Sequence, residues 1–542
     1  MLSYRKLAMR VLGHPLHTGG IDSPRPASQR AAAFILTAAM LTTLAAPAFA
    51  DIWHIENGDI TISAGESGNN VTQNNNTTYG DTNTIITNQN KDKASSHTVT
   101  IETNDKNDKV EVTLKDVNID TSSRNKAAVS VTGSGNTTIK LDGDNALKSD
   151  TYRSGIYGSG SGSLTITGGE NDSLTAQGGS SADGISSSGS LTISGGTVTA
   201  NGDDGGRGIS SSGSVTISGG STVTANGGSG TISGGDGIWS GGGVTISGGS
   251  TVTANGGNGG SLVGGDGIRS GGGLTVSDGT VTAKGGNGDS KDGYGGDGIR
   301  SGGVVTISGN TVNAAGGYGG KVGGYGICSF DRVAISGGTV EAAGGNGSTG
   351  GGSGIYSSVI DLSGSLELTA KAGSPTGKAL LQNGRELDLD TIKDKLGPGA
   401  KVTATDANGK TKQVSVPRPV EPEEPVIPEE SSSSSDGGSA APSAPASPLP
   451  GLTVTDKDGQ RISYTSTQSG NTLTVCVGRL TASLHVSLAA LRQLRAEGIE
   501  TIAFQTVLCS TSLSVDELLA MGGEDAEAVL THRLTDSSLT VG

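Results

Sequence analysis

A Gly-Ile pair recurs down the middle of the chain, and the residue after it is variously aromatic, basic or small. In chain order these residues are Tyr157, Ser186, Ser210, Trp239, Arg269, Arg300, Cys328 and Tyr356. Aromatic rings can stack on sugar rings, and guanidinium groups can hydrogen-bond to sugar hydroxyls. If a repeating fold turns these positions outward, the candidate carbohydrate-binding residues are Tyr157, Trp239, Arg269, Arg300 and Tyr356. The alternative is that these positions face solvent and tolerate many residue types without a binding role.

Catalytic side-chain sets are missing from the same part of the chain. No histidine lies between Ile156 and Ala370, and the acidic pair Asp203-Asp204 stands in a Gly-rich stretch without a charged partner at matching phase. A hydrolase or lyase needs such side chains, so this gap in the sequence bears on function. We expect a protein that is not an enzyme, with a polysaccharide lyase or hydrolase as the alternative.

Calcium is the metal that Gly-rich repeats bring into question, because it binds oxygen ligands. In the motif Gly-Gly-x-Gly-x-Asp, serine takes the aspartate position here, at Ser261 and Ser290. Asp236, Asp266 and Asp297 recur directly before the Gly-Ile pair, where turn formation explains an aspartate. We expect no metal and no cofactor, while calcium binding by the Gly-rich loops stays open.

A repeat of roughly 28 residues must position these side chains. The Gly-Ile isoleucines follow one another at steps of 29, 24, 29, 30, 31, 28 and 28 residues. They are Ile156, Ile185, Ile209, Ile238, Ile268, Ile299, Ile327 and Ile355. A (Val/Leu)-Thr-Ile-Ser run and a Thr-Val-Thr-Ala run follow most of them. A fixed period of this length indicates a solenoid of stacked coils.

Each run alternates apolar and small polar residues, as Val244-Thr245-Ile246-Ser247 does. That alternation predicts half-buried strands, and the Gly-Gly, Gly-Asn and Ser-Gly clusters between runs predict turns with positive φ. Three strands and three turns per repeat fit one rung of a right-handed parallel β-helix. The predicted fold is therefore mainly β, and the alternative is a disordered Gly/Ser-rich tract.

The first 50 residues are typical of a signal peptide. A basic leader precedes an apolar core, and Ala48-Phe49-Ala50 forms a cleavage site before Asp51. A retained membrane span is the alternative. No later segment approaches about 20 apolar residues, so we expect no transmembrane segment after cleavage. The predicted location is secreted or extracellular, with association to a cell surface left open.

Composition divides the rest of the chain. We expect an Asn/Thr-rich N-terminal cap over 51–98, β-helix repeats over 99–373 and a closing segment over 374–416. A disordered Pro/Glu/Ser/Ala linker follows over 417–450. Residues 451–542 then predict a small α/β or α+β domain, with a helix from Leu488 and a second helix opened by Ser514 as N-cap.

Charge and cysteine content limit the partners. A net charge of −15 argues against nucleic acid. The chain has three cysteines, Cys328, Cys476 and Cys509, which cannot staple a protein of this length. Cys476 and Cys509 both lie in predicted strands and could form a disulfide, and two separate buried thiols are an equal alternative.

The phrases from Val110 to Ile119 and from Gly213 to Gly220 resemble those of secreted Gram-positive bacterial proteins of the carbohydrate-binding-domain-containing, or right-handed parallel β-helix, kind. The resemblance spans about 51–373 and implies a pectin-lyase-like fold with a role on wall or host glycans. We therefore expect a non-catalytic, adhesin-like protein whose partner is a polysaccharide or host glycan, with its oligomeric state open. A passive stalk that presents the C-terminal domain is a further alternative.

Overall fold

The structure is a computed structural model. It describes residues 51–309, 311–417, 451–456, 460–462, 464–469, 471–477, 481–506, 510–521, 527–532 and 537–541. The chain divides between Pro422 and Glu423 into two compact units, which are described separately. The predicted signal peptide and residues 418–450 of the predicted linker lie outside the described residues. The domain limits given above stay predictions.

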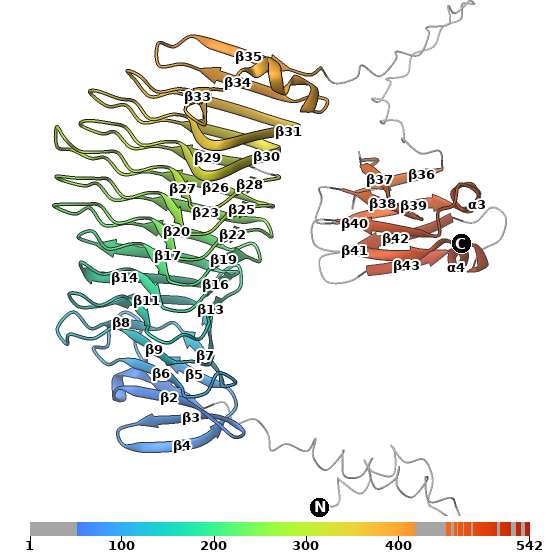
Figure 1. Cartoon of the computed structure of the whole chain (residues 1–542). Helices are drawn as coiled ribbons and strands as arrows, with labels where there is room; N and C mark the ends of the chain where they lie inside the picture. Colours follow the sequence, from blue (N-terminus) through green and yellow to red (C-terminus); the bar gives the residue numbers. More distant parts are fainter. Residues whose placement is uncertain are drawn as a thin grey trace, which may run out of the picture. The chain divides into compact units, whose positions relative to one another are not determined.

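The first unit is a mainly β solenoid, as the sequence predicts (Figure 1). Parallel pairing between successive rungs builds three files of strands. The file that carries the Gly-Ile pairs contains β2 (Ile60–Gly65), β6 (Val99–Thr103), β9 (Val129–Gly133), β12 (Ile156–Gly158), β15 (Ile185–Ser187), β18 (Ile209–Ser211), β21 (Ile238–Ser240), β24 (Ile268–Ser270), β27 (Ile299–Ser301) and β32 (Leu380–Gln382).

The other two files complete each rung. The second contains β1 (Ile52–His54), β5 (Thr84–Thr87), β7 (Lys109–Lys115), β10 (Asn136–Asp142), β13 (Leu164–Thr167), β16 (Leu191–Ser194), β19 (Val215–Ser218), β22 (Val244–Ile246), β25 (Leu274–Val276) and β28 (Val305–Ile307). The third contains β8 (Asn118–Asp120), β11 (Asp144–Lys148), β14 (Ser173–Ser180), β17 (Thr197–Asp203), β20 (Thr222–Asn226), β23 (Ser250–Asn255), β26 (Gly279–Lys284), β29 (Thr311–Ala315) and β34 (Lys401–Thr405). Two long strands, β30 (Ile327–Ala343) and β31 (Ile355–Lys371), pair in all three files.

The register confirms the repeat that was read from the sequence. Ile238 pairs with Ile268 in the next rung, and Ile268 pairs with Ile299. All three side chains are fully buried, as are the matching residues of the other two files, Ile246 and Val252. Each such side chain contributes about 1.5–3 kcal/mol by leaving water, so stacked rungs share one continuous core. A single rung would not bury enough apolar surface to stay folded.

Antiparallel hairpins lie at both ends of the solenoid (Figure 1). At the start, β3 (Gly68–Gln73) joins β2 to β4 (Asn76–Asp81), and a short 3₁₀ helix, η1 (Ile55–Asn57), precedes them. At the far end β35 (Thr411–Ser415) pairs with β34, near β33 (Arg385–Glu386) and the 3₁₀ helix η2 (Leu389–Lys395). Such hairpins cap the open edges of a stack, which would otherwise pair with other chains.

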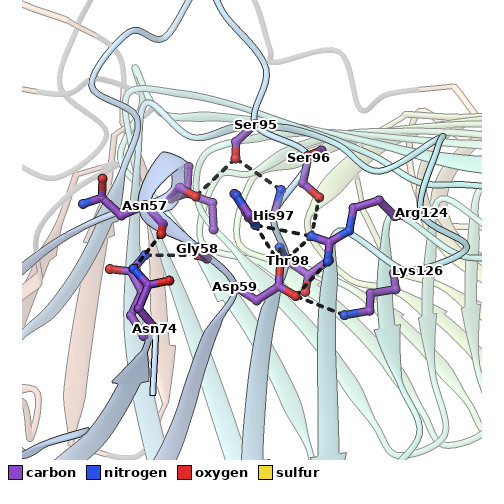
Figure 2. A network of polar contacts seen from close by, with 12 residues as sticks. Asn57, Gly58, Asp59, Asn74, Ser95, Ser96, His97, Thr98, Arg124 and Lys126 are labelled. Carbon is purple, nitrogen blue, oxygen red and sulfur yellow. Dashed lines mark hydrogen bonds and ion pairs between the residues drawn. The ribbon is translucent and has the colours of Figure 1, made fainter. Parts of the chain in front are cut away.

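A polar network around Asp59 ties the first rungs together (Figure 2). Arg124 donates two hydrogen bonds to the Asp59 carboxylate, at 2.6 and 3.1 Å, and Lys126 donates a third at 3.0 Å. The backbone N–H of Thr98 donates a fourth, and His97 lies 3.2 Å away. Burial would raise the pKa of Asp59, but these donors lower it well below its usual range. The cations converge on one carboxylate, so we assign the network a structural role.

Glycines serve two purposes in this unit. In the Ser-Gly-Gly turns between the second and third files they adopt positive φ, for instance 61° at Gly248 and 71° at Gly249, whereas those between the first and second files, such as Gly241-Gly242, do not. In the longer loops between the third and first files they are needed for close packing instead. A Cβ on Gly264 would lie 1.9 Å from the carbonyl oxygen of Gly286 in the next rung. The expectation that Gly clusters act through positive φ therefore holds for the short turns between the second and third files and for Gly205 in a longer loop, and not for most other Gly clusters.

The packed loops share a continuous series of amide hydrogen bonds, here called the glycine relay. Gly257 donates its N–H to the carbonyl of Gly235 in the preceding rung, and Gly265 donates to Gly257 within the same loop. Gly286 then donates to Gly265, and the series continues to Gly373. Each of the three named bonds measures 2.8 Å. The relay holds the loops as an ordered layer, so they form a fixed wall beside the strands.

In the described residues of the second unit, two four-stranded sheets and two helices are present. One sheet contains β36 (Leu452–Thr455), β39 (Ala482–Ser487), β42 (Glu527–His532) and β43 (Ser537–Val541). The other contains β37 (Thr465–Ser469), β38 (Thr472–Cys476), β40 (Thr501–Gln505) and β41 (Ser510–Ser514). The helices are α3 (Leu488–Ala496) and α4 (Val515–Met521).

The helix starts of this unit follow from their sequence. Ser487 caps α3 by accepting the N–H of Ala490, and Ser514 accepts the N–H of Glu517 at 3.4 Å, the capping residue that the sequence predicts for α4. Leu491 and Phe504 are fully buried in the core that the sheets share with the helices. Neither α3 nor α4 nor any other helix in the described ranges has the length and apolar character to cross a membrane.

Candidate binding groove

The five predicted carbohydrate-binding residues occupy one file of the first unit, because each follows a Gly-Ile isoleucine. Trp239 pairs in register with Arg269, and Arg269 with Arg300, on consecutive rungs. Tyr157 is three rungs before Trp239, separated from it by two serines. Tyr356 is two rungs beyond Arg300. The structure thus brings the middle three together and leaves the two tyrosines apart.

Two members of this file are not on the surface. Ser210 is 6% exposed and accepts a hydrogen bond from the Arg207 guanidinium at 3.4 Å. Cys328 is 1% exposed, and burial together with the Asp297 charge raises the pKa of its thiol to about 12. Strand alternation alone predicts an outward direction for both. Side chains of the adjoining loop segments and neighbouring rungs cover them, which a two-residue period cannot reveal.

A groove of about 460 Å³ lies between this file and the glycine-rich loops. Arg207, Arg269 and Arg300 contribute guanidinium groups to its lining, and Asp183, Asp236 and Asp266 contribute carboxyl groups. The lining also contains Ser233 and Val263, each followed in the sequence by a pair of glycines and then by Asp236 or Asp266. Trp239, Tyr157 and Tyr356 are not lining residues. The predicted arginines therefore belong to the groove and the predicted aromatics do not.

The aspartates before the Gly-Ile pairs form a ladder between rungs. Asp236 Oδ1 accepts the backbone N–H of Asp266 at 2.8 Å, and Asp266 Oδ1 accepts that of Asp297 at 2.7 Å. Asp297 Oδ1 in turn accepts the N–H of Tyr325 at 2.7 Å. The expected local turn does not explain these residues, since each carboxyl group hydrogen-bonds to the next rung. One oxygen of each carboxyl group is thereby fixed.

Burial has a strong effect on the acidity of the ladder. It raises the pKa of Asp297 to about 6, and it raises the pKa of Asp236. Asp266 lies between them, and burial together with the Asp297 and Asp236 charges raises its pKa well above the usual range. Carboxyl groups of this kind keep a proton at higher pH than exposed ones do. The ladder is therefore less negative than its composition suggests.

Two of the three arginines are paired within the protein. Arg207 Nε lies 3.6 Å from Asp236 Oδ2, and its guanidinium carbon lies 4.4 Å from the centroid of the Trp239 ring. Arg300 donates to Asp297 Oδ2 at 3.3 Å and lies 5.2 Å from the ring centroid of Phe330. Trp239 is half-buried and supports Arg207 by a cation–π contact. One face of the indole is therefore occupied.

Inspection of the sequence missed Arg207 and Asp183 as groove residues. Both stand immediately before a Gly-Ile pair, as Asp236 and Asp266 do. Alignment of the repeats at that position, instead of the position after the isoleucine, would have found them. Such an alignment could not show that the glycine-rich loops lie close enough to the Gly-Ile strands to form the other wall of the groove.

Other predicted sites fall elsewhere. Cys476 Sγ lies 3.2 Å from Gln505 Oε1 on the neighbouring strand, while Cys509 lies outside the described residues, so the disulfide stays a prediction. In the part of the chain that the structure describes, no group of three or more His, Cys, Asp or Glu side chains is arranged to hold a metal ion.

Comparison of the chain with protein-family models, with curated proteins and with solved structures gives no match.

Proposed function

We propose that the β-helix binds a polysaccharide without cleaving it, as a secreted or surface-located adhesin-like protein. The observation that carries the proposal is the groove, which presents guanidinium and carboxyl groups on consecutive rungs. Sugars offer hydroxyl groups that both donate and accept hydrogen bonds. Guanidinium groups match that chemistry as donors, because charge-assisted hydrogen bonds are stronger than neutral ones.

The lining of the groove repeats from rung to rung, which favours a chain-like ligand. Gly234 and Gly235 on one rung, and Gly264 and Gly265 on the next, leave backbone without side chains along the lining. Their missing Cβ atoms are required by packing, since a Cβ on Gly234 would lie 1.8 Å from the Gly257 carbonyl oxygen and one on Gly264 1.9 Å from that of Gly286. Rungs repeat at about 4.8 Å, so a polymer that lies along the solenoid axis meets the same chemistry several times.

A glycan array with the mature full-length chain tests the proposal. We expect retention on at least one plant, wall or mucin-type glycan, with no new reducing ends or shortened chains in the supernatant. The matched variants are Arg300→Ala in the groove and Arg385→Ala on β33, which is exposed and outside the groove. Loss of retention with Arg300→Ala alone supports the groove. Equal retention by both variants would place the binding site elsewhere.

One observation favours a second candidate, a polysaccharide hydrolase or lyase. Asp266 and Asp297 are buried carboxyl groups on adjacent rungs, and their pKa values are raised, as those of general acids often are. Against this, an oxygen of each is already bound by a backbone N–H. The assay for reducing ends separates the candidates. Product that disappears in Asp297→Asn would establish an enzyme and contradict the non-catalytic proposal.

A further inference from the structure

Arg269 differs from the other two arginines of the groove. Its side chain is exposed, and it stands in register between Trp239 and Arg300. Arg207 and Arg300 have their carboxylate partners at 3.6 and 3.3 Å. No hydrogen bond or ion pair of at most 4.0 Å joins the Arg269 guanidinium to any of the described residues. A guanidinium group carries five N–H donors and stays charged, so Arg269 presents an unused donor set to the groove.

The surrounding groups do not neutralise this charge by contact. The nearest ladder carboxyl groups by sequence register are Asp236 and Asp266, whose Oδ1 atoms accept backbone N–H groups. The second oxygen of Asp236 lies next to Arg207. Val263 and glycines of the loops also line the groove. Among the described residues, the Arg269 guanidinium is therefore the one in this groove without a carboxylate in contact, although its charge acts at longer range on Asp236 and Asp297.

We propose that Arg269 binds an anionic substituent of a glycan, either a carboxylate or a sulfate ester, and so makes the groove selective for acidic polysaccharides. This inference rests on the proposed glycan-binding function. A planar guanidinium group matches either anion with two parallel hydrogen bonds, whereas an ammonium group acts as a point charge. The acidic protein as a whole, with a net charge of −15, repels polyanions, so selectivity must arise locally at this guanidinium.

Matched polymer pairs test the inference. The mature full-length chain is titrated with hydroxyethyl cellulose against carboxymethyl cellulose, and with dextran against dextran sulfate, on the same array as the glycans above. We expect at least one charged member to bind about tenfold more tightly than its neutral partner. The pair that shows the preference identifies carboxylate or sulfate as the anion.

Three variants locate the effect. Arg269→Gln should abolish the preference, so that the charged polymer binds no more tightly than its neutral partner. Arg269→Lys should retain only part of the preference, and the exposed control Arg385→Gln should retain it fully. Equal affinity for the charged and neutral members of each pair, or a preference that survives Arg269→Gln, overturns the inference. In either case, binding of neutral glycans still supports the proposed function. If no glycan and no polymer binds the wild-type chain, the proposed function fails, and the inference fails with it.

Discussion

At the scale of single residues, the Asp236–Asp266–Asp297 ladder combines two opposing effects. Each carboxyl group satisfies a backbone N–H of the next rung, which links rungs where the chain turns from loop to strand. Each is also buried beside carboxyl groups of its own kind, so ionisation is unfavourable. Three arginines near the ladder reduce this cost without removing it. The ladder therefore links the stability of the solenoid to pH.

Asp266→Asn should stabilise the protein at pH 8. The amide keeps the Oδ1 acceptor for the N–H of Asp297 but cannot ionise. Because the pKa of Asp266 is raised in the folded state, the folded chain holds a proton that the unfolded chain has lost. Stability therefore falls as pH rises from about 4 through the folded-state pKa, and the full penalty applies above it. We expect a gain of about 1–3 kcal/mol at pH 8.

Thermal melts of wild type and Asp266→Asn between pH 4 and pH 8 measure this effect. The two curves should meet near pH 4, where both side chains are neutral. A variant that is less stable than wild type at pH 8 would mean that the Asp266 carboxylate is stabilised by its arginine neighbours after all.

Residue-level prediction from the sequence succeeded where strand alternation decided the outcome. The buried phase of Ile268 and the alignment of Trp239, Arg269 and Arg300 follow from a two-residue period and a repeat length. The sequence did not predict the groove, because one wall of the groove depends on how closely the glycine loops pack. Loop packing of this kind leaves no pattern of side chains in the sequence. For the same reason Trp239 was expected to offer a free face for stacking, although Arg207 covers one face.

At the scale of the element, one strand position shows how strictly the solenoid sorts side chains. Ile268→Asp should destabilise the protein by several kcal/mol, because it places an unpaired charge in a dry core. Arg269→Ala, one residue along β24, should stay within about 0.5 kcal/mol of wild type. Circular dichroism melts of both variants measure the difference. Equal stability of the two variants would contradict the placement of the Ile268 side chain in the core.

The glycine relay makes a second prediction for an element. Gly264→Ala should disrupt the loops, because the added Cβ would lie 1.9 Å from the Gly286 carbonyl oxygen. We expect a loss of about 1–3 kcal/mol or more. Hydrogen exchange should accelerate in the loop amides on both sides of the substitution, since the relay joins neighbouring loops.

Gly350→Ala is the matched control for that substitution. Gly350 stands in a loop of the same kind, but an added Cβ would meet nothing closer than the Val322 side chain, at 3.4 Å. The control should therefore exchange as the wild type does. If Gly264→Ala behaved in the same way, the loops would not be packed as a single layer.

At the scale of the whole molecule, the repeated rung makes the groove an extended surface, on which similar side chains recur from rung to rung. Its lining extends over the rungs from Asp183 to Arg300, about 19 Å at 4.8 Å per rung. Affinity for oligosaccharides should rise with chain length and reach a plateau once the chain spans that distance. Calorimetry with oligosaccharides of increasing length measures this dependence of affinity on chain length. A monosaccharide that binds as tightly as a long oligomer would indicate a compact pocket instead.

The repeats keep the register of their strands although their lengths differ, with steps between 24 and 31 residues. The difference is taken up largely in the glycine loops. The segment between β17 and β18 is short, and the segment between β26 and β27 is long. The height of the groove wall can therefore change by insertion or deletion at the loop tips without altering the core. If the groove binds a glycan as proposed, short insertions or deletions at the loop tips would alter its ligand preference, whereas most substitutions of the packed glycines would cause misfolding.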